Sequence, residues 1–154
     1  MITTANIYKS IRYALLRTFQ NVRIKDLKNI EAPCFYIQYV NSSEREVAND
    51  TINTETAFNI VYFSSEQTLI DLTEKETSLR QIFKKPLLIT YKNAKNQTKT
   101  RYLQAEEMSS DFDESEYTVV YSINFNFYQD AEVENPYDEE LNDNLMEILE
   151  INSD

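Results

Sequence analysis

The residues of this sequence that come nearest to a chemical motif are acidic. Asp111, Asp113 and Glu114 lie in the stretch DFDESE, where closely spaced oxygens resemble part of a calcium-binding loop. The EF-hand loop also requires a glycine turn and flanking helices, whereas this sequence has no glycine and the flanking residues have strand patterns. We therefore interpret the stretch as a solvated connection, with incidental metal binding as the alternative.

Other potentially reactive side chains also have a simpler interpretation. Glu106 and Glu107 could form a general acid and base pair, but nothing in the sequence predicts a pocket around them, so we expect an exposed strand end. Cys34 has no histidine to activate its thiol, and we interpret it as a small buried hydrophobic residue. The eleven tyrosines could stack on nucleic-acid bases, but most lie in strand-like stretches, where tyrosine commonly packs.

The composition excludes several familiar kinds of catalytic and binding site. The 154 residues contain no glycine, which phosphate-binding loops, dinucleotide fingerprints and nucleophile elbows require. They contain no histidine either, and the single cysteine cannot complete a zinc site. We therefore expect a protein that is not an enzyme, needs no cofactor or metal, and acts through its surfaces.

Charge is distributed unevenly along the chain. Residues 1–101 hold all 15 Lys and Arg and 10 acidic residues, a net of +5, whereas residues 102–154 hold 16 acidic residues and no basic one. This asymmetry predicts two complementary faces, or complementary neighbouring copies. The overall charge of −11 argues against specific nucleic-acid binding, because nucleic-acid-binding surfaces are basic.

The sequence gives no indication of a membrane protein. No apolar run approaches the roughly 20 residues that span a bilayer, and the first residues lack the apolar core of a signal peptide. A single cysteine is also typical of a reducing cytoplasm.

Two stretches have apolar residues at helical spacing. Residues 7–19 carry Ile7, Ile11 and Leu15 on one face, and residues 66–85 carry a similar stripe that ends before Pro86. The candidate capping residues are Thr3, Thr4 or Asn6 for the first helix and Ser64 or Ser65 for the second.

Strand patterns fill most of the remaining chain. The clearest is residues 116–130, EYTVVYSINFNFYQD, where apolar and polar positions alternate. A polar connection is predicted over residues 109–116. The other predicted strands are residues 22–27 as a weak edge strand, residues 34–40 as a central strand, and residues 57–63, 86–92 and 99–108.

Residues 41–56, NSSEREVANDTINTET, form a polar stretch between two predicted strands. The stretch is either a long loop or an extended hairpin, and long connections of this kind are often functional. We expect it to contact an assembly partner, and deletion of residues 44–53 should leave the fold intact. The candidate interface residues in it are Glu44, Arg45, Glu46, Asn49 and Asp50.

Together the patterns predict an α+β fold, with one mainly antiparallel or mixed sheet and two helices packed on one side of it. Residues 1–129 are predicted to form this core domain. Residues 130–154 form an acidic extension in which residues 137–151 are expected to be an amphipathic helix. Its apolar stripe, the second set of candidate interface residues, is Leu141, Leu145, Ile148 and Leu149.

The order of elements resembles a family of phage proteins. The stretches NIYKSIRYALLRTF, APCFYIQYVNSSE, FNIVYFSSE followed by TLIDLTEKETSLRQIF, and YTVVYSINFNFY are similar in pattern and layout to the tail terminator, or tail completion, proteins. These occur in phages, prophages and tail-like bacteriocins of Gram-positive bacteria. The resemblance spans roughly residues 5–129, and the acidic extension departs from the compact members of the family.

The resemblance implies a structural protein that assembles in the bacterial host cytoplasm into a homo-oligomeric ring, usually of six copies. The ring would lie at the head-proximal end of the tail, stop polymerisation of the tail tube and contact the head–tail connector. The implied partners are other copies of the chain, the tube protein and the connector, with the sheath protein as a further candidate. No cofactor is implied.

Other functions remain open on the sequence alone. The nearest alternative is another head–tail connector or a tube-initiation component. A carboxylate-dependent enzyme and a small regulatory binding protein are alternatives of different classes. The acidic extension could dock on its own core or on a neighbouring copy, and we favour the neighbour because ten acidic residues after Gln129 complement the basic first 101 residues.

Overall fold

The computed structural model describes residues 1–131. The predicted helix over residues 137–151, with its four interface residues, lies outside the described residues. The elements are α1 Thr4–Thr18, β1 Arg23–Ile24, the 3₁₀ turn η1 Leu27–Asn29, β2 Cys34–Ala48, β3 Thr51–Phe63, α2 Leu69–Phe83, β4 Leu87–Lys92, β5 Thr98–Leu103, β6 Glu107–Asp113 and β7 Thr118–Asp130.

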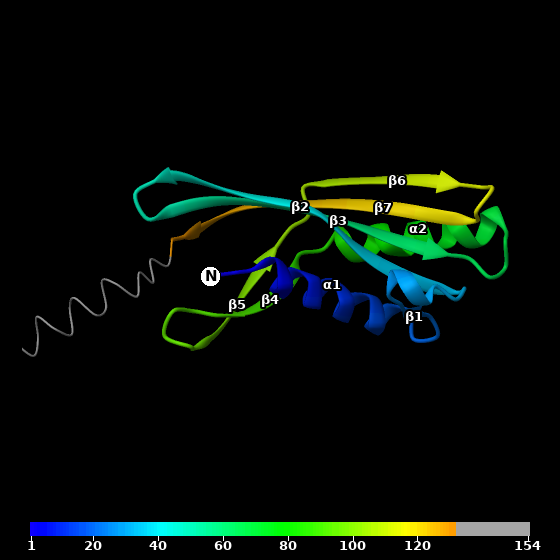
Figure 1. Cartoon of the computed structure of the whole chain (residues 1–154), viewed down its shortest axis with the longest axis horizontal. Coiled ribbons are helices and arrows are strands. Elements are labelled where there is room, and N and C mark those ends of the chain that lie inside the picture. The colour runs from blue at the N-terminus through cyan, green and yellow to red at the C-terminus, as the bar shows by residue number, and fades with distance from the viewer. Residues whose placement is uncertain (132–154) are drawn as a thin grey trace, which may run out of the picture.

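Five of the strands form one mixed sheet with the order β1-β2-β3-β7-β6. The pair β1 and β2 is parallel and the other pairs are antiparallel. Both helices pack on the same face of this sheet (Figure 1). The predicted α+β fold is therefore confirmed, and β1 is the short edge strand expected over residues 22–27.

The core forms between this face and the two helices because the apolar residues recur with the period of each element. Phe58, Ile60 and Tyr62 alternate along β3 and are buried, as are the alternate residues of β7 from Val119 to Phe127. Ile7, Ile11 and Leu15 form the buried stripe of α1, and α2 buries a second stripe that ends at Phe83.

The strands β4 and β5 form a separate two-stranded sheet and do not extend the main one. The difference from the single predicted sheet has a packing reason: Ile89 and Leu103 of this hairpin are buried in the common core, while Ser10 of α1 donates a 3.1 Å hydrogen bond to the Leu88 carbonyl. Arg101 of β5 donates to the Tyr128 carbonyl of β7 at 2.6 Å. The small sheet is thus held against α1 and the end of β7.

The start of each helix is set by a threonine. Thr3, one of the three predicted candidates, caps α1 in a capping box with Asn6. The cap of α2 is Thr68, so the prediction of Ser64 or Ser65 is wrong. The Ser64 hydroxyl instead donates to Asp71 at 2.6 Å, and Gln67, with φ of 54°, turns the chain before the helix begins.

Two polar stretches predicted as connections contain strand. Residues 41–56 belong almost entirely to β2 and β3, which meet at a two-residue turn, so the extended-hairpin alternative is confirmed. Residues 99–108 were predicted as one strand, but β5 ends at Leu103 and β6 begins at Glu107. Residues 109–116 were predicted as a solvated connection, but β6 extends over them as far as Asp113. It is polar because it is an edge strand that pairs only with β7 among the described residues.

Candidate assembly surfaces

The far part of the β2–β3 hairpin, which we call the arm (residues 41–54), is exposed along β2 and at its turn. Every residue from Gln38 to Asp50 is exposed, and the arm projects past the start of α1 (Figure 1). The structure places the five sequence-predicted residues of this stretch together at one end of the molecule: Glu44, Arg45, Glu46, Asn49 and Asp50. Their role as interface residues stays a prediction.

The arm has two different sides because its strands have different neighbours. Strand β3 pairs with β7 along its whole length, from Thr51 opposite Asp130 to Phe63 opposite Thr118. Strand β2 is covered by β1 only at Cys34 and Phe35. Within residues 1–131, the outer edge of β2 beyond Phe35 therefore presents unpaired backbone groups, which is the kind of edge that another chain can pair with.

Bulges interrupt this edge. The register between β2 and β3 shifts between Tyr39 and Asn41 and again between Glu46 and Ala48. Bulges and edge charges such as Glu44 hinder uncontrolled pairing between sheets.

The face of the main sheet that the helices leave uncovered carries rows of hydrogen-bonded polar side chains. Asn59 donates to Gln38 at 3.2 Å and accepts from the Ser122 hydroxyl at 2.7 Å. A second row, which begins in the arm, joins Asn53, Asn126 and Glu55 through bonds of 2.6 and 3.2 Å. Because the side chains in these rows hydrogen-bond to one another, this face is an ordered polar surface.

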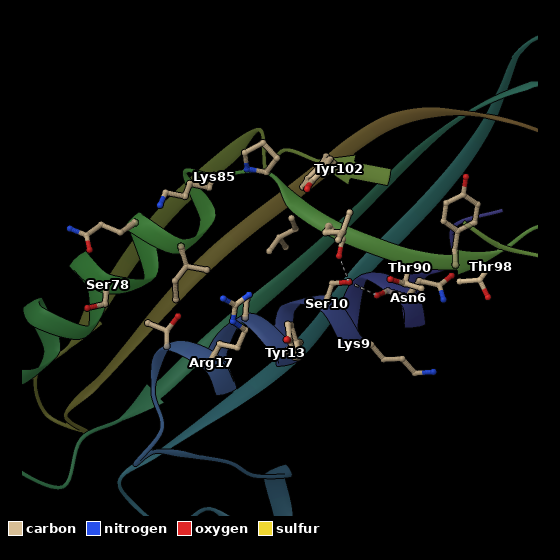
Figure 2. Close-up of a pocket in the computed structure, with 18 of the residues that line it drawn as sticks. Asn6, Lys9, Ser10, Tyr13, Arg17, Ser78, Lys85, Thr90, Thr98 and Tyr102 are labelled. Carbon is tan, nitrogen blue, oxygen red and sulfur yellow. Dashed lines mark hydrogen bonds between the residues drawn. The ribbon is translucent and has the colours of Figure 1, made fainter. Parts of the chain in front are cut away.

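A cleft of about 1060 Å³ lies on the helical side, between α1, the end of α2 and the β4–β5 hairpin (Figure 2). Its basic lining residues are Lys9, Arg17, Lys85 and Lys92, and no lining residue is acidic. The cleft also exposes Tyr13, Leu88 and Tyr102. Sequence reasoning missed this cleft because its residues come from four elements and are brought together only by the packing of the small sheet on α1.

The acidic residues considered for catalysis are exposed on the surface, and Cys34 is buried in the core. Glu106, Glu107, Asp111 and Glu114 are exposed. Asp113 is exposed too, and hydrogen bonds from Ser115 and from the Glu116 backbone lower the pKa of its carboxyl group. These hydrogen bonds are those of an ordinary turn.

Cys34 is fully buried, which confirms its interpretation as a core residue. Among residues 1–131, no group of three or more His, Cys, Asp or Glu side chains is placed to hold a metal ion. Over the same residues, neither helix is long and apolar enough to cross a bilayer.

These features define a small α+β protein whose notable features are exposed strands, a polar sheet face and a basic cleft. Comparison with protein families identifies its kind: the family model described as "Phage tail terminator protein" matches residues 6–138. The chain therefore belongs to the phage tail terminator family, as the resemblance predicted. None of the curated proteins compared with the chain matches it. Family membership identifies a structural component of a phage tail.

The family match extends past the point where the resemblance was expected to end. It reaches residue 138, whereas the resemblance covered residues up to about 129. The division into a core of residues 1–129 and an acidic extension stays a prediction. Residues 139–154 lie beyond the match.

Proposed function

We propose that this protein is the terminator of a phage or phage-like tail. In this role it forms a homo-oligomeric ring, of six copies as the family resemblance implies, at the head-proximal end of the tail tube. The ring stops tube polymerisation and presents its other face to the head–tail connector. It acts by binding alone, without catalysis, and assembles in the host cytoplasm.

The observation that carries this proposal, beside the family membership, is the arrangement of the two edges of the main sheet. The exposed edge of β2 lies at one side of the sheet and β6 lies at the opposite side. Different surfaces at opposite sides of one subunit are suited to a head-to-tail contact, and such a contact gives a closed ring when the rotation between subunits closes.

The arm supports a contact along the ring axis. Its distal residues from Asn41 to Asp50 are exposed, and they carry the charges of Glu44, Arg45 and Glu46 on a hairpin. A projecting hairpin of this length can reach a neighbouring ring. We assign it to the contact with the tube, which leaves the opposite end of the sheet for the connector.

The decisive experiment adds the full chain to polymerising tube protein of the same particle and measures tube lengths by negative-stain electron microscopy. We expect tubes to stop growing and to carry one ring at one end. Gold label on the protein should lie at the end nearest the head in intact particles. A label at the opposite end would assign the protein to tube initiation, and growth unaffected by excess protein would refute the terminator role.

Native mass spectrometry of the protein alone tests the ring separately from capping. Six copies in one species would agree with the proposal. A strict monomer at high concentration, with no ring even beside tube protein, would contradict it.

A further inference from the structure

All of the charged side chains that line the cleft between α1 and the β4–β5 hairpin are positive. Lys9 and Arg17 of α1, Lys85 after α2 and Lys92 at the end of β4 line it and are exposed. None of the four has an ion-pair partner among residues 1–131. Like charges gathered around one hollow raise the local concentration of an oppositely charged ligand.

The cleft also presents apolar surface to solvent. Tyr13 is 63% exposed, Leu88 is 46% exposed and Tyr102 is 67% exposed. Leu88 and Tyr102 are opposite each other in the β4–β5 register, so they lie side by side on one face of the hairpin. Aromatic and aliphatic side chains inside a rim of cations are suited to a partner with an apolar stripe and acidic flanks.

The chain contains a segment of this chemistry. Residues 132–154 hold nine acidic residues and no basic one, and Leu141, Leu145, Ile148 and Leu149 recur within them at helical spacing. We infer that the cleft binds the acidic C-terminal segment of a second copy of this chain. The inference rests on the proposed function, because it supplies a contact between neighbouring subunits of the assembly.

The lengths of the two surfaces agree. In a helix the apolar stripe from Leu141 to Leu149 would be about 12 Å long, and the face of α1 from Asn6 to Arg17 that lines the cleft is about 17 Å long at 1.5 Å per residue. The cleft can therefore hold the whole apolar stripe. A helix of residues 137–151 would be short for independent stability in water, so contact with the cleft would stabilise it.

The direction of β7 favours a second copy over the same chain. Strand β7 ends at the arm, where the Ala131 amide donates to the Asp50 carbonyl at 2.7 Å. The cleft begins nearby, since Gln129 bonds Ile2 just before α1, but from there it runs along α1 from Asn6 towards Arg17 and Lys85 (Figure 2). Strand β7 and the cleft therefore run in opposite directions, which favours the cleft of a second copy as the site of the segment that follows β7.

Disulfide trapping in the full chain tests the inference. Thr90→Cys places a thiol on an exposed, uncharged position of the cleft, and Asn144→Cys places one beside the apolar stripe. The natural Cys34 is fully buried and does not compete. Under mild oxidation we expect a ladder of cross-linked chains on non-reducing gels, collapsing to one band on reduction.

The matched control pairs Asn144→Cys with Ser65→Cys, an exposed and uncharged position outside the cleft. We expect at least a tenfold lower yield of cross-linked chains from this pair. A monomer band that contains an internal disulfide would overturn the inference in favour of docking on the same chain. The absence of any disulfide in the Thr90→Cys pair would overturn it altogether.

Charge reversal provides a second measurement. Lys9→Glu with Lys85→Glu in the Thr90→Cys and Asn144→Cys background should lower the yield about tenfold, and 0.5 M salt should lower it in the unreversed protein. Circular dichroism of each variant shows whether it has folded. A yield that is unchanged by both treatments would contradict a cleft that selects for acidic residues.

Native mass spectrometry of the same samples separates this inference from the proposed function. A ring without the cross-linked ladder overturns the docking of the C-terminal segment and leaves the terminator role standing. If the chain stays monomeric in the presence of its tube protein, both the docking of the C-terminal segment and the terminator role are contradicted.

Discussion

The hydroxyl of Tyr62 in β3 donates a 2.7 Å hydrogen bond to the carboxylate of Asp71 in α2. The same carboxylate accepts from Ser64 at 2.6 Å and from the Lys75 ammonium at 3.0 Å. Asp71 is only 3% exposed. Burial alone would raise the pKa of Asp71, but the three hydrogen-bond donors and the Lys75 charge outweigh it and hold this pKa below its ordinary value of 3.8.

The first prediction concerns this network. Asp71→Ala should lower the free energy of unfolding by about 3 kcal/mol, because it leaves buried donors without an acceptor. Because the carboxyl pKa is lower in the folded than in the unfolded protein, its stabilisation is present above about pH 4 and is lost as pH falls through the folded pKa. Urea titrations at pH 7 and pH 3 measure both effects.

Asp71→Asn isolates the contribution of the charge, and Asp111→Asn on the exposed edge strand β6 is the control. The acid-induced loss of stability should be smaller in Asp71→Asn than in the natural protein and unchanged in Asp111→Asn. Equal losses in all three proteins would show that the network is not the acid-sensitive element.

The spacing of apolar residues predicted those helices and strands that have one buried face. The stripe of Ile7, Ile11 and Leu15 located α1, and the alternation that begins at Val119 located β7, because burial of one face requires that spacing. Polar strands gave no such signal. Strand β6 is polar along most of its length and is recognisable only from its pairing with β7.

Contacts between distant residues explain the remaining differences. Serine is a common capping residue, but the Ser64 hydroxyl donates its hydrogen bond to Asp71, and Thr68 caps α2 instead. The cleft could not be predicted because the packing of β4 against α1 is what brings Lys9 and Lys92 to one hollow. The arm, in contrast, was located from polarity and length alone.

The second prediction concerns the turn that joins β4 to β5. Asn96 has φ of 59°, a left-handed conformation that asparagine tolerates and that most residues adopt only at a cost. Asn96→Ala should therefore cost about 1 kcal/mol, a fall in Tm of about 3 °C for a domain of this size. Asn96→Gly is the matched control and should change Tm little. Equal effects of the two substitutions would contradict this account.

The third prediction concerns Gln129, a polar residue on the buried face of β7. Its side chain accepts from the Ile2 amide at 2.9 Å and donates to the Ile2 carbonyl at 3.3 Å and to the Thr54 hydroxyl at 3.0 Å. Gln129→Ala should lower the free energy of unfolding by about 2 kcal/mol, because these buried groups lose their partners. Asp130→Ala, at the exposed neighbouring position, should change it by less than about 0.5 kcal/mol.

Hydrogen exchange shows where the effect of Gln129→Ala arises. We expect faster exchange of the Ile2 amide and of the first turn of α1, with little change in α2. Uniformly faster exchange across the protein would instead indicate a global loss of stability without a local role.

The last prediction concerns the arm. Deletion of residues 44–53 is too disruptive a test, because Thr51, Ile52 and Asn53 pair with the end of β7. Substitution of Glu44→Lys, Arg45→Glu and Glu46→Lys together keeps the backbone and reverses three exposed charges. Stability should change by little more than about 0.5 kcal/mol per site, whereas we expect capping to fail, because like charges then face each other across the contact with the tube.

The matched control is Glu114→Lys in the exposed β6–β7 turn, which changes the net charge by the same amount as the triple substitution. Tube lengths by electron microscopy, with the ring verified by native mass spectrometry, give the result. Tubes longer than natural with the arm variant, and tubes of natural length with the control, are expected. If the arm variant forms rings and still stops tubes at natural length, the arm charges have no part in capping.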